Sequence, residues 1–177
     1  MFHKYRWLFY VLLGLILTII YPMQELFSGN QNVYFIWALS KLHPATFAAD
    51  PLRNSPDPYP FFTWLMSQVS AKSLPVWTST IYWLLNIVYV TAFFGIANSA
   101  ANIFRHSSRL MLFSILFLFL HTSPIWGTYM HLLFDVDLRW IWDSGIAEQG
   151  ALRGYLQPSV FGAFLLLSFH LALKGRY

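Results

Sequence analysis

The chain alternates between long apolar stretches and shorter segments that carry its charges. Four stretches contain no Asp, Glu, Lys or Arg, and they are 18 to 32 residues long. A helix needs about 20 consecutive, mainly apolar residues to cross the hydrocarbon core of a bilayer. This pattern predicts an all-α, polytopic membrane protein with a single membrane domain over residues 1–177. We expect four transmembrane helices, at about residues 5–23, 75–100, 110–124 and 155–173.

The predicted spans leave two long loops on the same side of the membrane, over residues 25–72 and 125–153. The first loop predicts two amphipathic helices at the membrane surface, one of them the apolar run 33–42. In the second of these two helices, apolar side chains recur at the helical spacing of three and four residues. Its apolar positions are Phe62, Leu65, Met66 and Val69, and its polar positions are Thr63, Ser67, Gln68 and Ser70.

The third charge-free stretch contains two residues that interrupt helices. Pro124 lacks an N–H group and clashes with the preceding turn, and Gly127 follows it closely. We therefore expect the third span to end near Pro124. Residues 125–134 are expected to form a separate short helix that lies against the bundle.

The charged residues predict how the protein is oriented. The loops 25–72 and 125–153 hold all seven acids together with five bases, whereas the opposite side holds only bases. Lys and Arg near span ends favour the cytoplasmic side. Both termini are therefore predicted inside and both long loops outside. The basic residues of the predicted inner side are Lys4, Arg6, Arg105, Arg109, Lys174 and Arg176.

Composition supports a membrane protein and excludes several classes. Hydrophobic residues make up 57% of the chain and charged residues 10%, against about 25% charged in soluble domains. The absence of cysteine excludes disulfide scaffolds, thiol catalysis and cysteine-bound metal centres. The net charge of +4 fits a membrane protein, because basic residues on the inner side would face the anionic lipid headgroups of the inner leaflet. No soluble basic patch is present, so a nucleic acid partner is not expected.

Two carboxylates in the first outer loop are the candidate catalytic residues. Asp50 and Asp57 could each act as a general base at the membrane surface. Each also directly precedes a proline, so each could instead cap a helix that starts near Pro51 or Pro58. The two roles are compatible, because a capping carboxylate is held in a fixed position.

Other polar residues carry weaker signals. Asp135-Val136-Asp137 matches the short pattern that holds a metal ion bound to a nucleotide sugar, but nucleotide sugars lie on the other side of the predicted membrane. The six histidines show no metal-ligand spacing, so we expect neither a metal site nor a cofactor. Asn86 and Asn98 are expected to form hydrogen bonds between helices. Apart from Arg6 at the start of the first span, the predicted spans contain no charged residue, which argues against an ion-driven transporter.

The order of spans and loops resembles the opening of the GT-C class of membrane glycosyltransferases, which use polyprenyl-phosphate sugars. Two segments carry the resemblance. The first comprises residues 30–39 (NQNVYFIWAL), 43–51 (HPATFAADP) and 57–65 (DPYPFFTWL). The second is residues 150–162, which include GYLQPSVFG, and it is similar to a segment of GT-C-like membrane proteins of bacteria, which implies a bacterial inner membrane location.

The resemblance also has departures. Many GT-C enzymes carry an acidic pair early in the first outer loop, where this chain has Asn30-Gln31-Asn32. They also have about ten or more spans. The chain therefore resembles an N-terminal portion or a shortened relative of such an enzyme. By this resemblance, Asp50 or Asp57 would be the base, and Arg53 and Arg153 would bind the donor phosphate.

Two functions follow, and the sequence leaves open whether the chain is an enzyme. The first is a GT-C-like transferase, or part of one, that acts at the outer membrane face with membrane lipids and polyprenyl phosphate as ligands. The second is a small accessory subunit that packs on a larger membrane-protein partner. A helix face for such packing is offered by the small residues Gly95, Ala97, Ser99 and Ala100.

Overall fold

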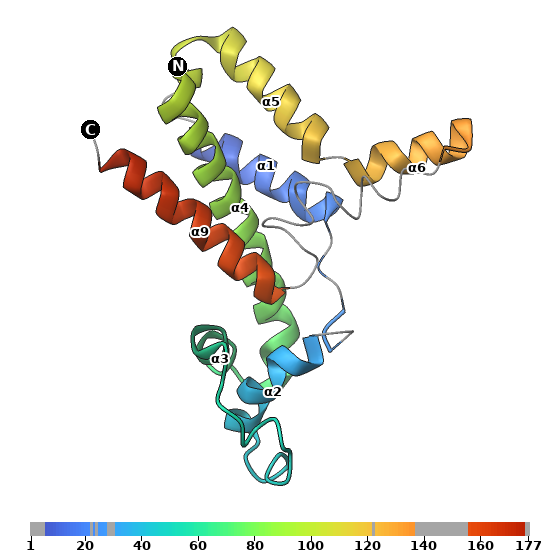
Figure 1. Cartoon of the computed structure of the whole chain (residues 1–177), viewed down its shortest axis with the longest axis vertical. Helices are drawn as coiled ribbons and strands as arrows, with labels where there is room; N and C mark the ends of the chain where they lie inside the picture. The colour runs from blue at the N-terminus through green and yellow to red at the C-terminus, as the bar shows by residue number, and fades with distance from the viewer. Residues whose placement is uncertain are drawn as a thin grey trace.

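The computed structural model describes residues 6–21, 23, 25–27, 31–121, 123–136 and 156–175. Within these residues every regular element is a helix and no strand occurs (Figure 1), which confirms the all-α class. The elements are α1 (Arg6–Ile20), α2 (Gln31–Leu42), α3 (Pro60–Met66), α4 (Leu74–Ala101), α5 (Ser107–His121), α6 (Ser123–Phe134) and α9 (Leu156–Lys174), with 3-10 turns at Ala71–Ser73 and Ile103–Arg105.

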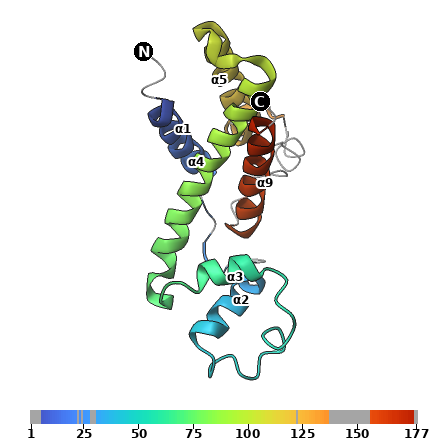
Figure 2. The ribbon, with the colours of Figure 1, turned by 90° about the vertical axis from the view of Figure 1, so that its left-hand side faces the viewer.

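Helix α4 is the axis of the molecule, and α1 and α9 pack along it (Figures 1 and 2). Its 28 residues span about 42 Å at 1.5 Å per residue. The predicted helix at residues 75–100 is therefore confirmed almost to the residue. Pro75 lies in the first turn of α4. The N–H groups of a first turn have no acceptor within the helix, so the N–H group that proline lacks costs no helical hydrogen bond there.

One described helix is long and apolar enough to cross a membrane, judged by length and composition. It comprises Ala71–Ala101, which is α4 with the 3-10 turn before it. Three further helical segments are apolar but shorter, and they are Trp7–Ile20, Ser107–His121 and Ser159–Lys174. The four-span topology consequently stays a prediction.

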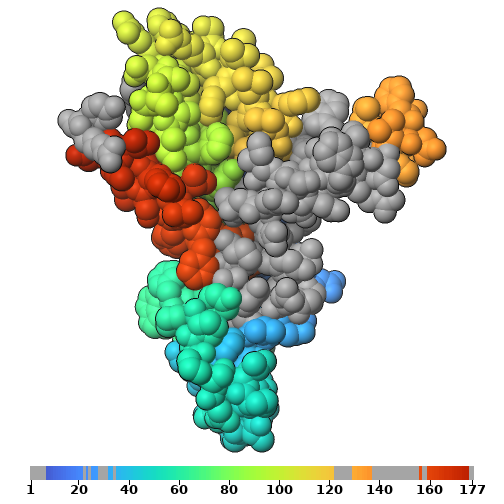
Figure 3. Space-filling model, in the orientation of Figure 1, coloured from blue at the N-terminus to red at the C-terminus, as the bar shows by residue number. Residues whose placement is uncertain are grey.

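The loop helices and the short turn lie at opposite ends of α4. Figure 2 shows α2 and α3 at one end, and the turn between α4 and α5 at the other, together with the start of α1 and the end of α9. In the space-filling view of Figure 3, the segment from α2 to α3 forms a narrow lobe beyond the start of α9. The two ends of the molecule thus differ in structure.

The turn after α4 is closed by two asparagines. Asn102 adopts a left-handed conformation (φ 50°), and its N–H donates to the carbonyl of Asn98 at 2.8 Å. The side-chain oxygen of Asn98 accepts from the N–H of Phe104 at 3.0 Å. A left-handed residue after the last turn is a common way to end a helix. Asn98 therefore caps a turn, and its predicted interhelical role is wrong.

Asn86 does bond between helices, as predicted. Its Nδ2 donates to Oγ1 of Thr18 on α1 at 2.9 Å, and Thr18 donates in turn to the carbonyl of Gly14. The predicted small-residue patch, by contrast, lies partly inside the molecule. A Cβ atom on Gly95 would collide with the imidazole ring of His170 on α9. Gly95 therefore serves packing within this chain.

Helix α6 is a separate short helix, as predicted, but its predicted packing against the bundle is wrong. Figure 1 shows α6 pointing away from α1, α4 and α9. The side chains from His131 to Val136 are all exposed, and those of Leu132, Leu133 and Phe134 are 65–71% exposed. The break between α5 and α6 falls just before Pro124, which agrees with the helix-breaking effect of proline.

Candidate functional site

The two candidate carboxylates lie in the connection between α2 and α3, where each closes a turn. Oδ1 of Asp50 accepts from the N–H of Leu52 at 2.8 Å. Oδ1 of Asp57 accepts from the N–H of Tyr59, also at 2.8 Å. In both turns the side chain bonds to the backbone two residues ahead, which is typical of aspartate in turns. Both carboxylates are consequently held in place by their own backbone.

The helix start predicted near Pro51 is wrong, and the one predicted near Pro58 falls two residues later, at Pro60. Residues 51–54 form turns, and α3 begins at Pro60 after Tyr59, whose backbone is not helical (φ −133°, ψ 55°). A proline disfavours the helical conformation in the residue before it. Pro56, Pro58 and Pro60 occupy alternate positions, so the chain cannot enter a helix until the last of them. The aspartates therefore stabilise turns and do not cap helices.

Arg53 lies between the two aspartates and is also bound to the backbone. Its Nη1 donates to the carbonyl of Pro44 at 3.0 Å. Asn54 donates from its side chain to the carbonyl of Asp50, and Ser55 donates to that of Leu52. These bonds fold the connection back on itself. Arg53 thus links the first part of the connection to the part that carries both carboxylates.

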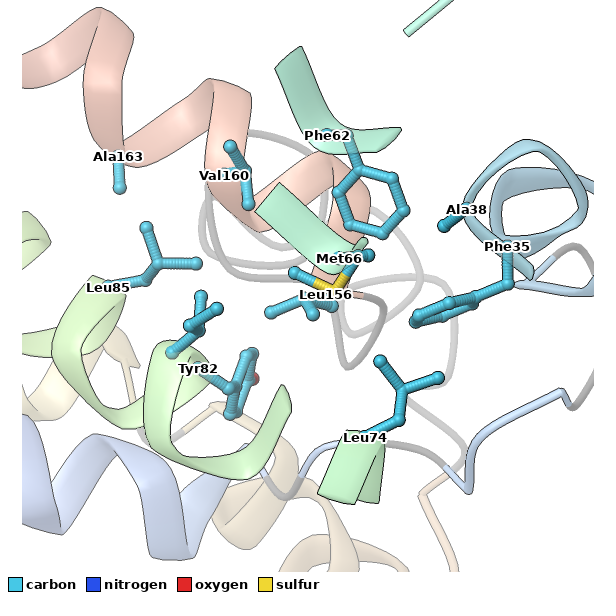
Figure 4. Close-up of a cluster of buried hydrophobic side chains, with 11 residues drawn as sticks. Phe35, Ala38, Phe62, Met66, Leu74, Tyr82, Leu85, Leu156, Val160 and Ala163 are labelled. Carbon is cyan, nitrogen blue, oxygen red and sulfur yellow. The ribbon is translucent and has the colours of Figure 1, made fainter. Parts of the chain in front are cut away.

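A hydrophobic cluster lies between the two loop helices and the long helices (Figure 4). It joins α2, α3, α4 and α9, so that residues far apart in sequence hold the two loop helices on the long helices. Phe35 and Phe62 meet edge to face, with ring centroids 5.4 Å apart. The buried members are Phe35, Ala38, Phe62, Met66, Leu74, Ile81, Tyr82, Leu85, Leu156, Val160 and Ala163.

The carboxylates have the chemistry that a general base requires. One oxygen of each is bound by the turn, and the second oxygen can accept a proton from a substrate hydroxyl. Asp50 and Asp57 are both partly exposed, so a substrate can reach them. Arg53 is the described cation nearest to them in sequence. The other predicted phosphate ligand, Arg153, lies outside the described residues, as does Asn30.

A buried hydrogen-bonded pair lies between α4 and α5, and sequence reasoning missed it. The hydroxyl of Tyr89 is 2.7 Å from Nε2 of His121, and Nδ1 of His121 is 2.7 Å from the carbonyl of Phe117. A carbonyl can only accept, so Nδ1 carries the proton and Nε2 accepts from Tyr89. The only signal in the sequence was a histidine inside an apolar stretch, which does not identify its partner.

The described residues contain no group of three His, Asp or Glu side chains that could hold a metal ion. Of the Asp135-Val136-Asp137 pattern, Asp135 follows α6 in a left-handed conformation (φ 53°) and its N–H donates to the carbonyl of His131. Asp137 lies outside the described residues. The metal-binding hypothesis for this pattern thus gains no support from Asp135, which ends a helix.

Comparison with known proteins identifies no relative. No protein-family model matches the chain, and neither a curated protein nor a solved structure matches it. The GT-C resemblance therefore rests on the segments and the helix order described above.

We expect Asp57→Ala to weaken the start of α3. The substitution removes the side-chain acceptor of the Tyr59 N–H group. Loss of one such hydrogen bond costs about 1 kcal/mol, which corresponds to roughly fivefold faster amide exchange if residues 61–66 open locally. Asp57→Asn is the matched control, because its side-chain oxygen can still accept. Equal exchange rates in the wild type and both variants would show that the turn does not hold α3.

Proposed function

We propose that the chain is a GT-C-like integral membrane protein and part of a glycosyltransferase that uses a polyprenyl-phosphate sugar at the outer membrane face. The observation that carries this proposal is the connection between α2 and α3. It holds two turn-fixed carboxylates and an arginine beyond one end of a helix that is long enough to cross a bilayer.

The charges at the two ends of the molecule support the proposed orientation. The turn between α4 and α5 carries Arg105, the first turn of α5 carries Arg109, and the end of α9 carries Lys174. The opposite end carries Asp50 and Asp57 as well as basic residues. Because Lys and Arg favour the cytoplasmic side, the connection between α2 and α3 belongs outside. In this proposal α1, α4, α5 and α9 are the four spans of an inner membrane protein, with both termini in the cytoplasm.

The proposed reaction uses these residues in complementary roles. Asp50 or Asp57 takes a proton from the acceptor hydroxyl, whose oxygen then bonds to the anomeric carbon of the sugar. The bond from that carbon to the phosphate oxygen breaks, and polyprenyl phosphate leaves with the electron pair. Arg53 and Arg153 are the proposed ligands of the phosphate charge. The base must lie within about 3 Å of the hydroxyl in the reacting complex.

The test is turnover by the purified protein in lipid nanodiscs. Polyprenyl-phosphate sugars and a set of acceptors are supplied to the wild type and to Asp50→Asn, Asp57→Asn and Arg53→Ala. The asparagine variants keep a turn acceptor, so a loss of turnover reports on proton transfer and not on loop structure. We expect one asparagine variant to lose turnover and Arg53→Ala to bind the donor more weakly. Turnover that survives all three changes would contradict this assignment.

A second function is favoured by the exposed surface of α6. Tyr129, Leu132, Leu133 and Phe134 are all more than half exposed on this helix. An accessory subunit would use such a surface to pack on a larger membrane-protein partner. This alternative predicts that the chain binds no polyprenyl phosphate and that Leu132→Ser with Leu133→Ser releases a copurifying membrane protein. Polyprenyl phosphate binding with no change in copurification would argue against it.

A further inference from the structure

Helix α3 is apolar on two faces, which differs from its predicted amphipathic pattern. Phe62, Thr63 and Met66 are completely buried against the protein. Phe61 and Trp64 are 46% and 53% exposed. Thr63, predicted on the polar side, is thus in the core, and large aromatic side chains take the exposed face. Burial within this chain accounts for one face of α3 and leaves the other unexplained.

The exposed rings of α3 continue onto α9. Phe61 lies against Trp64 with centroids 6.0 Å apart, and it meets Phe164 of α9 edge to face at 5.8 Å. Tyr59 lies 6.2 Å from Phe161 of α9. Phe161 and Phe164 are themselves 45% and 43% exposed. We call these five residues the aromatic face.

The aromatic face leads into the apolar outer surface of α9. Leu165, Phe169 and Leu171 are each 56–59% exposed along this helix. Helix α9 packs along α4, the helix that is long enough to cross a membrane. In the proposed membrane orientation, the exposed side of α9 contacts lipid, and the aromatic face is the continuation of that surface toward the outer boundary.

The depth of these residues along α9 agrees with a position at the membrane boundary. Phe161 and Phe164 come five and eight residues after Leu156, the first residue of α9. At 1.5 Å per residue they lie about 8 to 12 Å along the helix. Interfacial helices bury their apolar face about 5 to 10 Å into the boundary between headgroups and acyl chains. Aromatic side chains are also enriched at this level.

We propose that the aromatic face is a lipid-binding surface, with Phe61 and Trp64 inserted among the acyl chains next to the outer headgroups. This inference rests on the membrane placement in the proposed function. Its consequence is specific to the candidate site, because α3 directly follows the connection that carries Asp50 and Asp57. Anchoring α3 in the bilayer boundary holds both carboxylates near the level at which a lipid phosphate lies.

The absence of cysteine makes a direct test practical. Single cysteines replace Phe61, Trp64, Phe169 and Ala48 in separate variants, and each is labelled with a small fluorophore. The proteins are reconstituted into phosphatidylcholine vesicles whose acyl chains carry nitroxide quenchers at known depths. Phe169→Cys reports on α9, and Ala48→Cys is the water-exposed control in the connection between α2 and α3. Phe61, Trp64 and Phe169 are large apolar side chains that are already exposed in the wild type.

We expect loss of fluorescence at positions 61 and 64, strongest with quenchers near the headgroups, and little loss at position 48. Position 169 should be quenched most by probes nearer the bilayer centre. Quenching at 169 without quenching at 61 and 64 would overturn the inference and leave the proposed spans intact. No quenching at 169 would overturn the proposed spans, and the inference with them. Disulfide dimers formed through Trp64→Cys without quenching would assign the face to a second copy of the chain.

Discussion

Replacing Gly14 by alanine is expected to destabilise the packing of α1 on α4 by about 1–3 kcal/mol, the usual cost of adding a methyl group to a well-packed contact. A Cβ atom on Gly14 would lie 2.7 Å from Cγ1 of Ile87 and 3.1 Å from its backbone N and Cα atoms. A side chain can rotate away from such a contact, but the backbone of α4 cannot. The two helices would have to separate, and the bond between Asn86 and Thr18 lies at the same contact.

Thermal unfolding of the purified protein in one detergent measures this effect. Gly175→Ala is the matched control, because its Cβ atom would meet the carbonyl oxygens of Leu171 at 3.5 Å and Ala172 at 3.9 Å, which are ordinary contacts. We expect a clearly lower midpoint for Gly14→Ala and almost no change for Gly175→Ala. Equal midpoints for the two variants would show that α1 and α4 are not in close contact.

The second large effect is expected at the buried pair of Tyr89 and His121. Tyr89→Phe removes the hydroxyl that donates to Nε2 of His121, and the imidazole is enclosed by Phe93 and Phe117 with no access to water. His121→Leu leaves the tyrosine hydroxyl without its acceptor. Each single change leaves one buried polar group unpaired, whereas the double change removes both. The double variant should therefore be more stable than the sum of the single effects implies.

A double-mutant cycle measures this coupling from the unfolding free energies of the four proteins. Hydrogen bonds between membrane helices give coupling energies of about 0.6 kcal/mol on average and up to about 1.7 kcal/mol. The contact is short and buried, so we expect a value in the upper half of that range. Strictly additive effects of Tyr89→Phe and His121→Leu would mean that the two side chains do not interact in the folded protein.

The sequence predicted helices well where a long apolar run determined them. Helix α4 was predicted at residues 75–100 and found at Leu74–Ala101, because an uninterrupted apolar stretch and an early proline define it. The sequence predicted helix starts less well where prolines occur close together. Asp50 and Asp57 each precede a proline, which suggested helix caps, but the alternating prolines delay α3 until Pro60. The prediction that both aspartate side chains accept a hydrogen bond from a nearby backbone N–H group was nevertheless correct.

The identity of a distant partner could not be predicted. The pairing of Tyr89 with His121 joins residues 32 positions apart, and helical spacing within one segment carries no information about it. The exposed rings of Phe61 and Trp64 were missed for a related reason. The apolar period of α3 predicted one buried face, but α2, α4 and α9 together determine which side of so short a helix is covered.

The central claim is that the chain crosses the membrane, with the α2–α3 connection outside and the α4–α5 turn inside. Labelling of single cysteines in intact cells with a membrane-impermeant maleimide tests it most directly, with Ala48→Cys in the connection and Ser107→Cys at the start of α5. Ala48→Cys should be labelled in intact cells whose outer face is accessible, and Ser107→Cys only after the membrane is permeabilised. Labelling of both positions from the same side would contradict the account.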